Sequence, residues 1–180
     1  MQIPPTSHPE ASDWAPVFNA DLSQAKGAVD SFKVQDGVIK TVGEGMLWSD
    51  KSYTDFVLDL DFKTGKAANS GVALHCSDIE NWVANSIEVQ IADDHAESRA
   101  DTAPHWRCGA IFGHTAPTKS AVKKPGQWND LTITCYDGKV YVLMNGVQVT
   151  VMDRSKYTSA EKNPDGSDIP PWLSKPVAEL

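Results

Sequence analysis

Apolar and polar residues alternate along much of the chain. The clearest stretch is 55–63, in which Phe56, Leu58, Leu60 and Phe62 share one parity while aspartates occupy much of the other. This period of two predicts a strand with one face in a core and the other in water. Stretches of similar character are 31–34, 37–42, 70–76, 86–92, 108–112, 131–136 and 140–151.

Short turn signals lie between or beside these stretches. Asp36-Gly37, Asp137-Gly138 and Asn145-Gly146 are dipeptides that accept positive φ and favour hairpins. Hairpins join antiparallel strands, and the stretches follow one another without helical periods between them. The pattern therefore predicts an all-β fold, an antiparallel two-sheet sandwich or jelly roll.

Two stretches break the alternation, 94–107 and 115–127, and their composition is that of loops. Long loops in a compact β protein often carry function, so we expect both to form walls of a ligand site. Residues 157–180 are rich in Pro, Asp and Ser and predict an irregular tail. With 180 residues the chain fits a single domain, 1–180, whose core covers about residues 17–151.

The charge balance narrows the classes of partner. There are 16 Lys and Arg against 24 Asp and Glu, a net charge of −8, and the largest basic cluster is Lys123-Lys124. Phosphate contacts require concentrated positive charge, so we expect no nucleic acid partner. No apolar run approaches the roughly 18–20 residues of a membrane span. A neutral or cationic ligand fits better, and the pattern leaves the oligomeric state open.

The three cysteines, Cys76, Cys108 and Cys135, lack the C-x-x-C spacing of zinc or redox sites. Cys135 alternates with apolar residues and is expected in the core. A Cys76–Cys108 bridge is an alternative in an oxidising compartment, although free buried cysteines are common. The first residues, 1–5, lack the basic and apolar regions of a secretory signal.

The segment 86–95 concentrates chemically active side chains. In a strand, Glu88 and Gln90 project from the face opposite the apolar residues between them. A bulge or a strand end near Ala92 would bring Asp93 and His95 onto the same face. Two carboxylates and an imidazole suit general acid–base catalysis. The competing interpretation is a polar strand face that simply meets solvent.

Four motifs occur in one order along the chain: Asn69-Ser70-Gly71-Val72, Glu88-Val89-Gln90-Ile91 followed by Asp93 and His95, Gly109-Ala110-Ile111, and Pro125-Gly126-Gln127-Trp128-Asn129. Together they resemble the 3-keto-disaccharide hydrolase family, with similarity over about residues 17–151. The resemblance implies a concanavalin A-like jelly roll and export from a bacterial cell, to the periplasm or the cell surface, with a leader outside this chain. Members usually end in a strand pair without a counterpart in 157–180, so we expect that pair to be missing here.

The resemblance also implies a carbohydrate-active hydrolase or lyase, a glycosidase that cleaves 3-keto-disaccharides or other 3-keto-glycosides. A carbonyl at C3 acidifies the proton at C2, so that a base can form an enediolate that expels the C1 substituent before water adds back. We expect His95 or Glu88 as the base and Asp93 as its partner or as the acid. The alternative is a lectin-like carbohydrate-binding module that uses the same sheet without chemistry.

Further contacts complete the expected site. Gln90 is expected to orient substrate hydroxyls, and the other expected substrate contacts are His75, Trp106 and Lys119. A divalent metal bound by Glu88, Asp93 and His95 is an alternative that carboxylate and imidazole ligands allow. No cofactor is firmly indicated.

Overall fold

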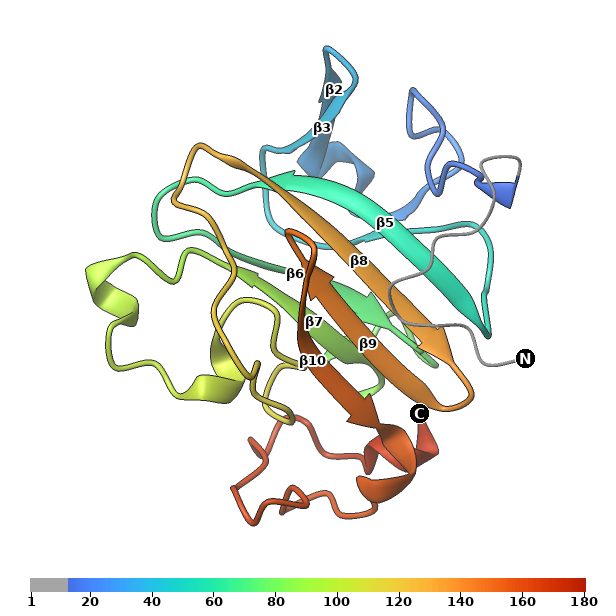
Figure 1. Ribbon diagram of the computed structural model, residues 1–180. Helices are drawn as coiled ribbons and strands as arrows, with labels where there is room; N and C mark the ends of the chain where they lie inside the picture. The colour runs from blue at the N-terminus through green and yellow to red at the C-terminus, as the bar shows by residue number, and fades with distance from the viewer. Residues whose placement is uncertain (1–12) are drawn as a thin grey trace. The chain divides into compact units, whose positions relative to one another are not determined.

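The structure is a computed structural model that describes residues 13–180, in two compact units (Figure 1). The first unit is Pro9–Tyr53, described from residue 13 onward. It holds two small antiparallel pairs: β1 (Lys26–Gly27) with β4 (Leu47–Trp48), and β2 (Phe32–Gln35) with β3 (Val38–Thr41). A short 3-10 helix, η2 (Val29–Ser31), precedes β2. Asp36 and Gly37 both have positive φ, which confirms the predicted hairpin turn.

The second unit, which includes Thr54–Leu180, contains the longer strands. One sheet is antiparallel throughout in the order β10-β9-β8-β5. Its two hairpins turn at Asp137-Gly138 and Asn145-Gly146, where all four residues have positive φ. The strands are β5 (Phe56–Lys63), β8 (Trp128–Tyr136), β9 (Lys139–Met144) and β10 (Val147–Asp153).

The other layer of this unit is built on β6 (Asn69–Leu74) and β7 (Ile87–Ala92), which pair antiparallel. The free edge of β7 is extended by residues 109–112, through a bridge between Val89 and Ile111. This segment forms only a bridge, where the sequence predicted a strand over 108–112. The remaining regular elements are the 3-10 helices η3 (Trp82–Ala84), η4 (Glu97–Arg99), η5 (Pro104–Trp106), η6 (Arg154–Lys156) and η7 (Val177–Glu179).

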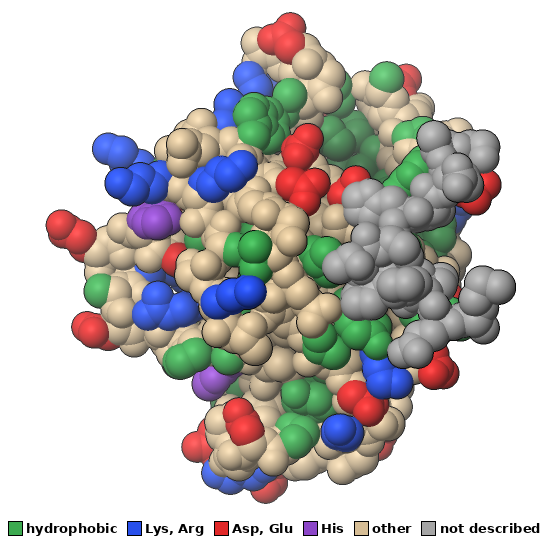
Figure 2. All heavy atoms as spheres, viewed as in Figure 1, with side chains coloured by type: hydrophobic (Ala, Val, Ile, Leu, Met, Phe, Trp, Pro, Cys, Tyr) green, Lys and Arg blue, Asp and Glu red, His purple; other side chains and the backbone are tan. Residues whose placement is uncertain are grey.

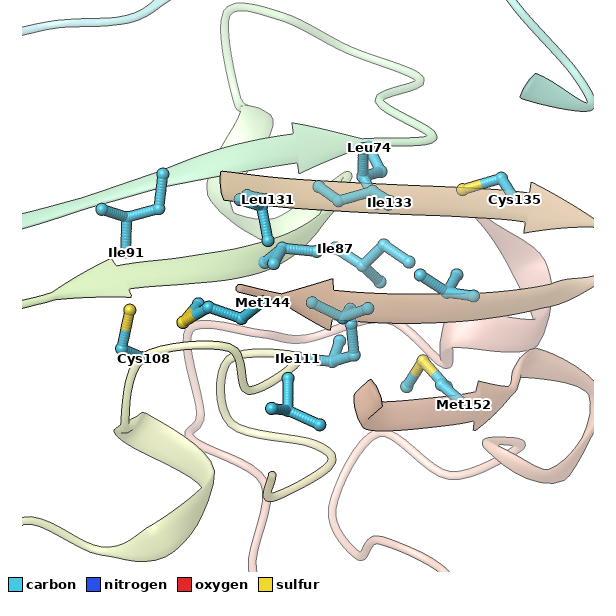
Figure 3. Packing of buried hydrophobic residues seen from close by; sticks show 14 of the residues in the cluster. Leu74, Ile87, Ile91, Cys108, Ile111, Leu131, Ile133, Cys135, Met144 and Met152 are labelled. Carbon is cyan, nitrogen blue, oxygen red and sulfur yellow. The ribbon is translucent and has the colours of Figure 1, made fainter. Parts of the chain in front are cut away.

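The core of the second unit lies between these two layers. Figure 3 shows Ile87 of β7 close to Leu131 and Ile133 of β8 and to Met144 of β9, within one cluster that also includes Ile91. Ile87, Leu131, Ile133 and Met144 are almost completely buried. Two antiparallel layers packed face to face confirm the predicted all-β sandwich.

The irregular tail contributes to this core. Residues 157–180 contain no strand beyond a single bridge between Lys162 and Asp168, in agreement with the prediction. However, Val177 is fully buried within the core cluster, and Ile169 and Leu173 are buried as well. The core therefore extends beyond residue 151, where the sequence pattern placed its end.

All three cysteines are free, so the alternative of a Cys76–Cys108 bridge is wrong. Cys108 and Cys135 are buried, and burial raises the pKa of each thiol to about 12. Both thiols stay protonated at neutral pH and pack as apolar groups, which confirms the core position expected for Cys135.

Acidic and basic side chains are interspersed on the face drawn in Figure 2. Among the described residues, no helix has the length and apolar character needed to cross a bilayer.

A substitution in the core tests the packing of the two layers. Ile133 pairs with Leu58 of β5 and Val142 of β9 and is fully buried. Ile133→Ala should lower the free energy of unfolding by about 2–5 kcal/mol, because the vacated volume cannot fully collapse. The exposed Ile79 provides the matched control, and Ile79→Ala should change the free energy of unfolding by less than about 0.5 kcal/mol. Urea denaturation followed by tryptophan fluorescence measures both, and equal effects would contradict this packing.

Candidate active site

The polar face of β7 lies opposite the core face of the same strand. Cross-strand pairing sets Glu88 beside Ala73 and Gln90 beside Gly71 of β6. On the other edge of β7, the antiparallel bridge at Val89 places Phe112 opposite Glu88. Residues opposite one another share a face, so Glu88 is flanked by a small residue on one side and an aromatic ring on the other.

Gly71 provides the space that the Glu88 side chain occupies. A Cβ atom built at Gly71 would lie 1.9 Å from Oε1 of Glu88 and 2.6 Å from its Cγ. The carboxyl side chain therefore lies across the glycine backbone, and no larger residue fits at position 71 without displacing it. This is a close approach between strands, one of the structural reasons for glycine in a strand.

The Glu88 carboxyl lies in a largely apolar setting. It makes no hydrogen bond or ion pair with any described residue, and burial raises its pKa from 4.5 to about 7. Removal from water without a compensating donor disfavours the charged form. At neutral pH both the acid and its carboxylate are populated, so this group can accept a proton and release it again.

Gln90 is not open to a ligand. Its side chain is 2% exposed, and Nε2 donates to Asn69 Oδ1 at 3.1 Å and to the Trp106 carbonyl at 3.4 Å. The first bond orients the exposed Asn69, which shares this face of the sheet, and leaves the Asn69 amide N–H groups available. The sequence predicted that Gln90 contacts substrate, but its burial leaves Asn69 as the exposed amide on this face. Asn69 is found through cross-strand register, which alternation in a single sequence does not provide.

The loop 94–107 forms a wall beside this face. Asp94 accepts from the Cys108 backbone N–H at 3.0 and 3.2 Å, and its Oδ1 lies 3.7 Å from Nε of Arg99. Burial raises the pKa of Asp94, although the Cys108 N–H and Arg99 oppose the shift. Arg99 also donates to the Trp106 carbonyl. These bonds close the loop on itself, and the bond from Gln90 Nε2 to the Trp106 carbonyl ties it to β7.

Trp106 and Phe112 form the apolar part of the wall. Their ring centroids are 5.5 Å apart with an interplanar angle of 35°. Phe112 lies opposite Glu88 across the bridge at Val89, so the pair borders the face on which the carboxyl group lies. The expected role of Trp106 in lining the site is thus compatible with its position.

Asp93 and His95 have other partners. Asp93 is 3% exposed, and its two oxygens accept from the backbone N–H groups of Ala67 at 2.8 Å and His95 at 3.0 Å. His95 is exposed, with Nε2 3.2 Å from the Val122 carbonyl. The β6–β7 ladder shows no register shift, so of the two predicted alternatives the bulge is absent and the strand end at Ala92 is present. Asp93 therefore caps the turn and does not join Glu88.

The expected metal set is not assembled. Over residues 13–180 no three His, Cys, Asp or Glu side chains are grouped to hold a metal ion. Glu88, Asp93 and His95 therefore do not fit a shared ion, and the alternative that joined them through a metal is corrected.

His75 and Lys119 are the remaining residues expected to contact substrate. His75 adopts positive φ after β6, and its ring nitrogens lie 3.4 and 3.5 Å from Nη1 of Arg154. Burial, and then the Arg154 charge, lower the pKa of His75 to about 4. It is neutral at physiological pH and contacts Phe56 at a ring distance of 6.4 Å. Lys119 is exposed in the loop 115–127, and its expected substrate contact stays a prediction.

Comparison with known proteins places this geometry in a family. Residues 12–174 match the family model described as the 3-keto-alpha-glucoside-1,2-lyase-like domain. The chain belongs to this family. Family membership indicates a carbohydrate-active protein, and the match spans the whole polar face of β7 and the loop beside it. No protein of curated function matches the chain.

Three solved structures of proteins from the bacterium Parabacteroides distasonis ATCC 8503 are similar to this chain. One, described as "Putative glycosyl hydrolase", is 47% identical with a TM-score of 0.90, over 93% of this chain and 86% of that one. Two others with the same description are each 24% identical. Their TM-scores are 0.64 and 0.59. The matches cover 74% and 77% of this chain, and 68% and 64% of the respective solved chains. The latter two support the fold alone.

A double-mutant cycle tests the close approach at Gly71. Gly71→Ala should lower the free energy of unfolding by about 1–3 kcal/mol in the wild-type background, because the new Cβ displaces Glu88. In the Glu88→Ala background, Gly71→Ala should lower the free energy of unfolding much less. Gly65 has open space around its Cβ position and no positive φ, so Gly65→Ala is the matched control and should cost little in either background. An equal cost of Gly71→Ala in both backgrounds would refute the contact.

Proposed function

We propose that the chain cleaves 3-keto-glycosides, 3-keto-disaccharides among them, with Glu88 as the base that removes the proton at C2. The observation that carries this proposal is the state of the Glu88 carboxyl group. It has no partner among the described residues, it lies beside an aromatic wall, and burial raises its pKa to about 7. A base is most effective when its pKa lies near the working pH.

The proposed chemistry begins with a ketone at C3 of the sugar. The ketone acidifies the proton at C2, and the Glu88 carboxylate accepts that proton while the electron pair forms an enolate across C2 and C3. The enolate then expels the C1 substituent, whose oxygen takes a proton from water. Addition of water to the unsaturated product completes a net hydrolysis, and protonated Glu88 returns its proton to solvent at neutral pH because its pKa is near 7.

The number of available carboxyl groups favours this elimination route over direct displacement at C1. Common glycosidase mechanisms place two carboxyl groups on either side of the bond, about 5–9.5 Å apart. Asp93, the expected second carboxyl group, uses both oxygens to hold backbone N–H groups. Of Glu88 and Asp93, the two carboxyl groups expected here, Glu88 is the one left available, and the elimination needs only one base.

Asn69 supplies the polar contact that this route requires. Its side-chain amide is exposed on the face of Glu88 and is oriented by Gln90. An amide N–H directed at an enolate or hydroxyl oxygen stabilises developing negative charge. We assign this donor role to Asn69, with Gln90 as the residue that positions it.

Turnover of a 3-keto-glucosyl disaccharide tests the proposal. The wild type should cleave it and leave the parent disaccharide intact, because only the ketone acidifies the proton at C2. Glu88→Gln should lower kcat by about 10²- to 10⁴-fold. Below pH 7, kcat/KM should fall about tenfold per pH unit, since the base must be unprotonated. The exposed Glu80 provides the matched control, Glu80→Gln, which should retain wild-type rates.

Two results would contradict the proposal. Full turnover by Glu88→Gln would exclude Glu88 as the base. Binding of the keto-sugar without any turnover by the wild type would favour a lectin-like binding module instead.

A further inference from the structure

An exposed tryptophan in the tail lies at the end of the aromatic wall. Trp172 is 50% exposed, while the residues on either side of its turn, Pro170 and Leu173, are buried. The Leu173 N–H donates to the Pro170 carbonyl at 2.9 Å and closes this turn. Large aromatic side chains gain free energy from burial, so a turn that buries its ends and exposes its indole presents an apolar surface to solvent.

The turn is held firmly beside the candidate active site. A Cβ atom at Gly113 would lie 2.6 Å from Leu173 Cδ1 and 3.1 Å from Pro170 Cδ, so both residues pack directly on this glycine. Asn163, which is buried, donates from Nδ2 to the Gly113 carbonyl at 2.9 Å. Gly113 follows Phe112, the ring opposite Glu88. The position of Trp172 is therefore fixed relative to the carboxyl group.

Three aromatic rings connect Glu88 to solvent. Phe112 contacts Trp106 at 5.5 Å between centroids, and Trp106 contacts Trp172 at 6.4 Å with an interplanar angle of 62°. The row begins at Phe112, the residue opposite Glu88, and ends at the exposed indole. A pyranose has an apolar face formed by its C–H groups, and such a face packs well on an aromatic ring.

We propose that Trp172 is the stacking platform for the leaving-group sugar. This inference rests on the proposed function, which places the 3-keto ring at Glu88. The indole of Trp172 is two ring contacts farther out, so the sugar unit that reaches it is the one attached at C1. Trp172 would then select substrates that carry a second ring over those with a small leaving group.

Binding to the inactive Glu88→Gln protein tests the platform without depending on turnover. Isothermal titration calorimetry compares a 3-keto-glucosyl disaccharide with the methyl 3-keto-glucoside, which lacks the second ring. Adding Trp172→Ala should weaken binding of the disaccharide about 3- to 10-fold. Binding of the methyl glycoside should change less than twofold, and Trp172→Phe should restore much of the disaccharide affinity.

Trp128 provides the matched control. It is 44% exposed at the start of β8, with Lys63 Nζ 4.8 Å from its ring centroid, and is not part of the aromatic row. Trp128→Ala should leave the affinity of both ligands unchanged. An equal effect of Trp172→Ala on the two ligands, or no effect on either, would overturn the platform. No binding of either ligand to Glu88→Gln would overturn it as well.

Kinetics separate this inference from the proposed function. In proteins with Glu88 intact, Trp172→Ala should raise KM for the disaccharide while KM for the methyl glycoside stays the same. If the wild type turns over neither substrate yet discriminates by Trp172 in binding, the proposed function fails and the platform stands. If turnover is found and Trp172→Ala affects both substrates alike, the platform fails and the function stands.

Discussion

The account depends on one close approach, that of the Glu88 side chain over the backbone of Gly71. Because no Cβ stands at position 71, a carboxyl group can lie against the sheet between β6 and the segment that carries Phe112. The loop 94–107 is fixed beside it by Gln90, Asp94 and Arg99, whose bonds hold the tip of the loop. Together these contacts remove the carboxyl group from water without giving it a donor, and the raised pKa follows from that removal.

This arrangement has a cost in stability. A pKa raised from 4.5 to about 7 means that the folded protein holds the proton more tightly than the unfolded chain does. The corresponding stabilisation is present below pH 4.5 and is lost as the pH rises through 7, on the order of 3 kcal/mol in all. A buried carboxyl group with no partner is costly to retain, and positions where function requires such a group are where strongly shifted pKa values concentrate.

Much of the fold could be predicted from the sequence because strand alternation and turn dipeptides are local signals. The hairpins at Asp36-Gly37, Asp137-Gly138 and Asn145-Gly146 were predictable, since positive φ is a property of those residues. The packing of the tail was not, because Val177 and Leu173 become core residues only through contacts with distant segments. Local composition alone indicates an irregular tail and carries no information on where it packs.

The candidate site could be predicted only in part, for the same reason. Alternation placed Glu88 and Gln90 on one face, but the partners of Asp93 and Gln90 are set by register and by loops that fold back from elsewhere in the chain. Asp93 became a turn cap, and Asn69 and Trp172 were identified only through neighbours distant in sequence.

The central claim is that Glu88 is a desolvated carboxyl group poised near neutrality, and a direct titration tests it. In protein labelled with ¹³C at the glutamate carboxyl carbons, NMR should show one resonance that titrates near pH 7 and that is absent in Glu88→Gln. A Glu88 resonance that titrates between about pH 4 and 5, the ordinary range of a glutamate carboxyl group, would contradict the account.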